Sequence, residues 1–409
     1  MEINFEGINL YFCFLISQLV ISTGVNMNSE LNFLHISNSC SDFTSNLFQE
    51  LTSKQEDTEN VASSSLSAYI ILSLLLHGTD GETREEIKSG LNLNDLDKTQ
   101  EELQSLFMHL NNVTDADLQL TNGIYVDSNF QLRDCFMSKS QEYYQTSVEK
   151  MIFQNSDVAA NQINEWVKEK TKNKILNIIS SNDIDKYTKV ILINALYFKS
   201  SWLNPFESQF TEKRKFFNID GIETYVPTMH KTFNVLHGHI KSLRSSFIKM
   251  KYLSKEFEMI LILPDEKDGL RELEKNFDWN KISKASCLTT EVELFLPKFK
   301  VEATINLKSA LKKLGMNAMF TERANFSRMA EKALYVDRVL QKIIVEVDEK
   351  GSEAAAATVA QIRSRRMVTD TDVFAVDHPF MFIIHHKPSS IPLFIGSIRK
   401  LGGNYKDEL

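Results

Sequence analysis

The chain has 409 residues, of which 43% are hydrophobic and 24% charged, and its formal net charge is −8. This acidic balance argues against a general nucleic-acid-binding surface. The 7 prolines and 14 glycines are scattered, and no Pro/Gly/Ser-rich linker, internal repeat or low-complexity run divides the chain. We therefore expect one large domain rather than the two or three that length alone suggests.

Hydrophobic periodicity predicts a mixture of helices and strands without regular βαβ alternation, which indicates an α+β fold. One helix is predicted around Phe43, Leu47 and Leu51, and another over residues 66–78, with Gly78 at its end. A third helix is predicted to begin at a capping Ser156 and to pack through Ile163, Trp166 and Val167. A fourth is predicted over residues 307–314, before Gly315. Strands are predicted over residues 190–198, 259–263, 292–296 and 340–347. The nearly continuous apolar character of residues 190–198 is expected of a strand covered on both faces.

The N-terminal region contains an apolar run, residues 10–21, that is too short to span a bilayer. Small residues, Ser22 and Gly24, follow it. This pattern predicts a signal peptide over residues 1–24 and no stable membrane insertion.

A run of small residues leaves the strand predicted at 340–347. Its members are Gly351, Ser352, Glu353, Ala354, Ala355, Ala356, Ala357 and Thr358. Composition alone favours a solvated linker, but an extended segment of small side chains is also able to enter a sheet without steric penalty. A basic tip follows, with Arg363, Arg365 and Arg366 before Met367.

Familiar motifs of catalysis are absent from the sequence: it contains no Gly-x-Ser-x-Gly, His-Glu-x-x-His or phosphate-binding loop. His385 and His386 lie in an apolar stretch and are interpreted as strand residues rather than metal ligands. The cysteines, Cys13, Cys40, Cys135 and Cys287, show no metal-type spacing and no full disulfide framework. We expect no catalytic residue, metal or cofactor, and the chain is expected not to be an enzyme.

The basic clusters at residues 168–174 and 308–313 are interpreted as solvated helix faces rather than polyanion sites.

Several motifs, in order from about residue 42 to 401, resemble those of the serpins. They are Asn194, Ala195, Leu196, Tyr197, Phe198 and Lys199 with Trp202 and Phe206; residues 162–167; residues 263–265; residues 296–299; residues 377–380; and residues 393–396. The resemblance implies a serpin domain over residues 40–403, with three β-sheets, about nine helices and an exposed reactive-centre loop at 349–373.

The resemblance also implies a mechanism. A serpin is a suicide substrate: the protease serine attacks the loop and forms an acyl-enzyme, and the freed hinge then inserts into the large sheet. The small residues from Gly351 to Thr358 suit such a hinge. Glu349 and Lys298 match a family pair at the top of the sheet, Trp202 and Asn194 match residues beneath the insertion gap, and Ser64 and Ser67 match serines that hydrogen-bond as the sheet opens.

Three positions depart from the family pattern: Ser65 replaces a usual Pro, Gln341 a usual His and Ser200 a common Gly. We expect altered latency rather than lost inhibition, because Gln is still able to bridge polar groups.

The loop tip permits two registers. The usual spacing from Gly351 makes Arg365 the scissile residue and predicts a trypsin-like target, whose pocket carboxylate pairs with one Arg. A shift of one residue makes the bond between Arg366 and Met367 scissile. The tip then reads Arg-Ser-Arg-Arg, a motif typical of furin-like proprotein convertase substrates, with Arg363 and Arg365 as recognition contacts.

The chain ends in Lys406, Asp407, Glu408 and Leu409, the signal read by the KDEL receptor of the endoplasmic reticulum. We therefore expect residues 404–409 to form a retrieval tail, and sequons at Asn112 and Asn325 permit glycosylation. We favour a monomeric convertase inhibitor of the endoplasmic-reticulum lumen. The alternatives are a secreted inhibitor of trypsin-like proteases and a non-inhibitory luminal chaperone.

Overall fold

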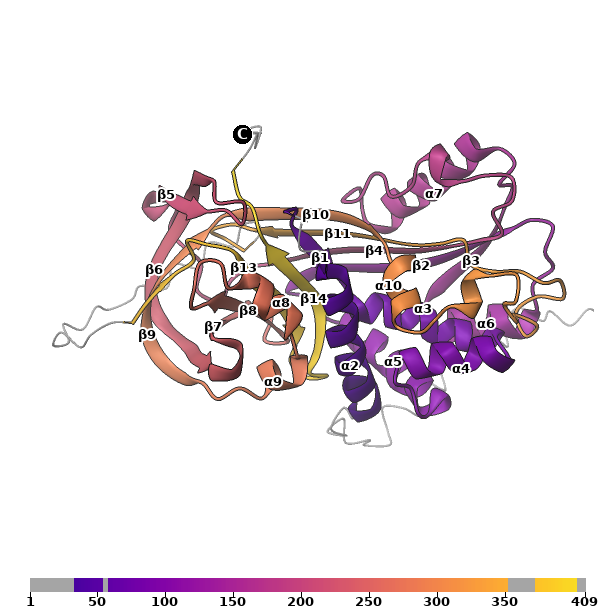
Figure 1. The fold of residues 1–409 in the computed structure, drawn as a ribbon, viewed down its shortest axis with the longest axis horizontal. Helices are drawn as coiled ribbons and strands as arrows, with labels where there is room; N and C mark the ends of the chain where they lie inside the picture. Colours follow the sequence, from indigo (N-terminus) through magenta and orange to yellow (C-terminus); the bar gives the residue numbers. More distant parts are fainter. Residues whose placement is uncertain (1–32, 54–57, 352–371, 403–409) are drawn as a thin grey trace, which may run out of the picture. The chain divides into compact units, whose positions relative to one another are not determined.

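The computed structural model describes residues 33–53, 58–351 and 372–402, which form nine α-helices and two hydrogen-bonded β-sheets (Figure 1). The helices are α2 (Leu34–Thr52), α3 (Ser65–Gly78), α4 (Gly81–Gly90), α5 (Leu96–Asn111), α6 (Asp134–Glu142), α7 (Ser156–Lys170), α8 (Leu270–Lys275), α9 (Trp279–Ser283) and α10 (Lys308–Lys313). None of these helices combines the length and apolar character needed to cross a membrane.

The smaller sheet has five strands in the order β10–β11–β4–β2–β3. Their bounds are β2 (Ala116–Asp127), β3 (Thr146–Met151), β4 (Val190–Ser200), β10 (Phe299–Asn306) and β11 (Arg338–Val347). The two strands next to each other at its centre, β4 and β11, run parallel, and Asn194 lies opposite Gln341. Both strands therefore end at the same edge of the sheet.

Both faces of β4 are covered, as its apolar run predicts. Ile191 and Ile193 pack in a cluster with Ile163 of α7, whereas Leu192 and Leu196 join the main core on the other face. Figure 1 shows α7 on one side of this sheet and α3, α5 and α6 on the other. Successive residues of a strand point to opposite faces of the sheet. Because both faces of β4 contact apolar layers, its sequence is apolar throughout and lacks the apolar–polar alternation of a half-exposed strand.

The larger sheet contains nine strands in the order β1–β14–β13–β8–β7–β6–β9–β12, with β5 paired to β6. Their bounds are β1 (Val61–Ser63), β5 (Glu212–Phe217), β6 (Glu223–Ile240), β7 (Ser245–Lys251), β8 (Phe257–Pro264), β9 (Leu288–Pro297), β12 (Asp372–Ala375), β13 (Phe380–His386) and β14 (Ile391–Ile398). The long β6 pairs with β5, β7 and β9 and joins them into one sheet. A separate third sheet, which the resemblance implies, is not resolved in the described part of the chain.

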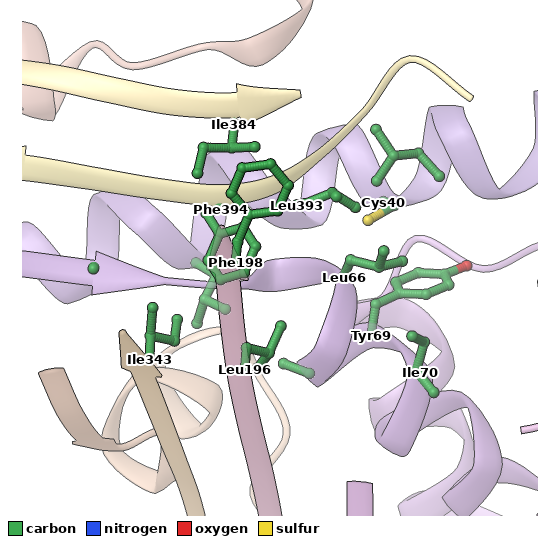
Figure 2. Close-up of a cluster of buried hydrophobic side chains, with 14 of the residues drawn as sticks. Cys40, Leu66, Tyr69, Ile70, Leu196, Phe198, Ile343, Ile384, Leu393 and Phe394 are labelled. Atoms are coloured by element: carbon green, nitrogen blue, oxygen red, sulfur yellow. The ribbon is translucent and has the colours of Figure 1, made fainter. Parts of the chain in front are cut away.

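The main core lies between the two sheets and α3. Phe198 of β4 packs against Phe394 of β14 with ring centroids 5.9 Å apart, and Leu66 and Ile70 of α3 lie in the same cluster (Figure 2). Residues 65–76 of α3 are all buried, so the helix predicted over this segment lies within the core.

The predicted end of α3 at Gly78 is confirmed, whereas the cap of α7 differs from the prediction. Gly78 is the last residue of α3, and its missing side chain makes room for Met329 and Phe136, because a Cβ there would lie 2.8 Å from Met329 Cβ. The cap of α7 is Asn155, whose side chain accepts from Val158 N, and Ser156 is the first helical residue. Gly315 follows α10 with φ +90°, so it ends that helix in the left-handed conformation that glycine favours.

Candidate functional site

A buried carboxylate stands immediately after β11. Glu349 is 8% exposed, and its Oε2 lies 2.9 Å from Nζ of Lys298, the residue between β9 and β10. Thr211 Oγ1 donates to the other oxygen at 2.8 Å. Burial by itself raises the pKa of Glu349, but the hydrogen bonds from Lys298 and Thr211 outweigh burial and hold this pKa below its usual value. The carboxylate therefore ties the end of β11 to β10 in its ionised form.

Trp202, just beyond β4, binds the same turn from the other side. Its backbone N donates to Lys350 O at 3.0 Å, and its indole Nε1 donates to Asp348 O at 2.9 Å. The indole stacks on Tyr252, with ring centroids 4.4 Å apart. The end of β11 is thus fastened to the end of β4.

Gly351 is the last residue described before the loop, and no other residue fits there. Its φ is +81°, and a Cβ would lie 2.5 Å from Ser200 O and 2.6 Å from Trp202 N. Both the left-handed conformation and the close approach of two backbones require glycine.

A second group of polar side chains lies lower in the sheet. Gln341 Oε1 accepts from Ser63 Oγ at 2.9 Å and from Ser64 N at 3.0 Å, and its Nε2 donates to Ser64 O at 2.9 Å. All three residues are buried. This amide joins β11 to the segment that begins α3.

The neighbouring strands continue this group with two asparagines. Asn122 Oδ1 accepts from Asn194 Nδ2 and from Ser67 Oγ, both at 2.8 Å, and Ser64 Oγ accepts from Ser67 N at 3.3 Å. The structure therefore brings together Ser64, Ser67, Asn194 and Gln341, with Asn122 as an additional member.

Asn122 is the residue that the sequence interpretation missed. It lies within β2, but the pair Asn122 and Gly123 is typical of a turn, so the sequence favours another role. A Cβ on Gly123 would lie 3.0 Å from the ring of Trp166 in α7, so this glycine makes room for the helix. Only the pairing of Asn122 with Asn194 across β2 and β4 reveals the connection.

Several predicted functional residues lie outside the described residues. These are the hinge residues beyond Gly351 (Ser352, Glu353, Ala354, Ala355, Ala356, Ala357 and Thr358), the loop-tip residues Arg363, Arg365, Arg366 and Met367, the signal peptide at 1–24, and the tail residues Lys406, Asp407, Glu408 and Leu409. The two sequon asparagines, Asn112 and Asn325, are both exposed.

The family model described as serpin (serine protease inhibitor) matches residues 38–401. The chain belongs to the serpin family. It is 31% identical to antichymotrypsin-2 of Bombyx mori over 366 residues, which covers 88% of this chain and 97% of that protein. It is 32% identical to the leukocyte elastase inhibitor of Sus scrofa, with 87% and 97% covered.

Solved serpin structures show the same fold. The structure described as Serpin48, a highly specific serpin in the insect Tenebrio molitor, superimposes with a TM-score of 0.81 at 30% identity. The match covers 92% of this chain and 100% of that one.

Family membership corrects one expectation. The sequence interpretation expects only that the chain is not an enzyme, because it contains no catalytic motif. That view is wrong in this respect: serpins are suicide-substrate inhibitors, so a member enters the covalent reaction of a serine protease as the reactant that is trapped.

Proposed function

We propose that this serpin is a suicide-substrate inhibitor of furin-like proprotein convertases in the secretory pathway, with the bond between Arg366 and Met367 as its reactive bond. The observation that carries the proposal is the multibasic run Arg363, Ser364, Arg365 and Arg366 in the segment between β11 and β12. Convertases have acidic clefts that read several basic side chains at once, so Arg363 and Arg365 are recognition contacts.

The arrangement of β4 and β11 supports the trapping step. These strands are parallel neighbours, and the chain leaves β11 through Gly351, whose positive φ suits a reversal of direction. A segment that turns back there runs antiparallel to both strands, and antiparallel pairing is slightly more stable per residue than parallel pairing. The small side chains from Ser352 to Thr358 suit a strand that enters a covered sheet.

The two ends of the chain support a luminal location. A signal peptide over residues 1–24 delivers the chain to the endoplasmic reticulum, and the KDEL receptor retrieves it through residues 406–409. The exposed Asn112 and Asn325 suit glycosylation there. In this proposal the mature protein is a monomer with one serpin domain over residues 40–403 and a tail at 404–409.

One experiment tests the target class. The purified protein is mixed with furin and separately with trypsin, complexes are resolved on denaturing gels, and the released fragment is weighed by mass spectrometry. A furin complex with cleavage after Arg366 is expected. Cleavage of the loop without any covalent complex contradicts inhibition and favours a luminal serpin chaperone.

The second candidate is a secreted inhibitor of trypsin-like proteases that uses Arg365. The usual spacing from Gly351 to the scissile residue favours it. A gel-stable complex with trypsin alone, cut after Arg365, selects this candidate. Secretion of the full-length chain is compared with secretion of a chain that lacks residues 406–409. If the two are secreted equally, the result argues against retention in the endoplasmic reticulum.

A further inference from the structure

Three potential metal ligands from distant parts of the chain meet outside the serpin site. His109 lies in the last turn of α5, Glu256 in the connection between β7 and β8, and His386 at the end of β13. His109 Nε2 is 2.9 Å from Glu256 Oε2, and His386 Nε2 is 3.8 Å from the same oxygen. Their ligand atoms all lie within 4.8 Å of one another, and no other such group occurs among the described residues.

The ring of His386 is oriented by its neighbour Ser389. The Ser389 hydroxyl donates to His386 O at 3.5 Å and lies 2.7 Å from His386 Nδ1, so in this arrangement it accepts the Nδ1 proton. His386 Nε2 then presents its lone pair toward Glu256. A histidine that binds metal usually donates its second ring N–H to a polar group in this way.

The Nε2 atom of His386 is a buried polar atom whose hydrogen-bonding capacity is not satisfied by the described residues. The His386 side chain is fully buried, and this nitrogen has no hydrogen-bond partner in the described part of the chain. A bare lone pair that faces a carboxylate oxygen at 3.8 Å is unfavourable until a positive charge lies between them.

We propose that His109, Glu256 and His386 bind a divalent cation of the zinc class. Two imidazoles and one carboxylate are typical zinc ligands, and a tetrahedral ion with bonds of about 2.1 Å requires ligand atoms about 3.4 Å apart. The distances of 2.9 and 3.8 Å to Glu256 Oε2 lie on either side of that value. Small side-chain rotations at Glu256 and His109, which are 33% and 23% exposed, complete the geometry and leave a fourth position for water.

The bound ion joins three segments that are separate in the sequence. Lys387 N already donates to Glu256 O at 2.8 Å, so the β7–β8 connection is held against the end of β13 before any ion binds. The ion adds α5 to this pair. The site is therefore structural and independent of which protease the reactive loop binds, and it departs from the sequence-based expectation of no metal site.

Titration of the untagged, chelator-treated full-length protein with Co²⁺ and with Zn²⁺ tests the proposal. We expect one equivalent of Co²⁺ to bind with the visible absorption of a four-coordinate ion, and Zn²⁺ to displace it and raise the thermal midpoint. His109→Ala and Glu256→Gln should each weaken binding by at least about tenfold, and Ser389→Ala should weaken it by about tenfold. His386 is left unchanged because it is fully buried.

His239→Ala is the matched control, because His239 also faces a carboxylate, Asp265 at 2.9 Å, but belongs to no group of three ligands in the described residues. It should bind Co²⁺ as the wild type does. The thermal midpoints of all variants without metal establish that each is folded. Absence of saturable binding overturns the proposal. So does wild-type binding by both His109→Ala and Glu256→Gln.

Discussion

The side-chain amide of Gln341 in β11 hydrogen-bonds to both backbone groups of Ser64, to N at 3.0 Å and to O at 2.9 Å. Ser64 caps α3, because its hydroxyl accepts from Ser67 N. One glutamine thus fastens a helix N-terminus to a central strand of the five-stranded sheet. Any movement of β11 away from α3 must break these bonds.

Gln341→Ala should destabilise the protein markedly. The change leaves Ser64 N and O unpaired in a buried site, and each unpaired group costs about 1–3 kcal/mol. The thermal midpoint should fall by several degrees, and conversion to latent or polymeric forms on native gels should accelerate. Gln341→His restores the residue usual in serpins and should lose less. Equal midpoints for wild type and Gln341→Ala contradict the role assigned to this amide.

Asn122 and Ser67 should behave as a coupled pair. Asn122 Oδ1 accepts from both Ser67 Oγ and Asn194 Nδ2, so Asn122→Ala removes two hydrogen bonds and Ser67→Ala only one. We expect Asn122→Ala to be the more destabilising. In urea unfolding, the loss in free energy of unfolding of the double variant should be smaller than the sum of the two single losses by about 1 kcal/mol. Strict additivity would show that the two side chains act independently.

Lys298→Met should destabilise the protein in a pH-dependent way. The folded-state pKa of Glu349 is below its ordinary value of 4.5, so its ionisation stabilises the fold above about pH 4.5. This stabilisation is lost as the pH falls through the folded-state pKa. Lys298 is 39% exposed, so we expect a modest loss at pH 7 of about 1–2 kcal/mol.

The measurement compares thermal midpoints of wild type and Lys298→Met between pH 7 and pH 3. The difference between them should shrink at the acidic end, where Glu349 becomes protonated. Glu349→Gln mimics the protonated side chain, and adding Lys298→Met to it should change the midpoint little. A difference that stays constant with pH would be inconsistent with the ion pair.

Gly351→Ala should be far more damaging than Gly221→Ala. Both glycines have nearly the same positive φ, +81° and +79°, but a Cβ on Gly221 meets nothing within 4 Å. Gly221→Ala therefore carries only the left-handed backbone penalty of about 1 kcal/mol. Gly351→Ala adds a collision with Ser200 and Trp202, which separates β11 from β4. Thermal midpoints and the yield of gel-stable protease complex report the effect, and similar losses for both variants would exclude the collision.

Arg363→Ala should distinguish the two loop registers. In the convertase register Arg363 is a recognition contact, so the rate of furin inhibition should fall by at least about tenfold while trypsin inhibition is retained. The matched variant Arg366→Ala should abolish the furin complex. Equal loss of furin and trypsin inhibition in Arg363→Ala would refute the convertase register.

Local patterns in the sequence were sufficient for the elements that they encode directly. The apolar run at residues 190–198 predicts a strand covered on both faces, and β4 is such a strand. Gly315 predicts the end of α10, because a left-handed cap depends on a single residue. Gly78 is also correctly predicted as the end of α3. Its close packing against Met329 and Phe136 is a tertiary contact that the local pattern does not reveal.

The sequence by itself determined the α+β class and the serpin family, because periodicity and short motifs are local properties of a chain. Only the tertiary structure decided which polar groups meet. Asn122 joins Asn194 across β2 and β4, and His109, Glu256 and His386 come together from α5, the β7–β8 connection and the end of β13. The physical reason is that such contacts depend on strand register and helix packing, which bring together residues more than 70 positions apart in the sequence.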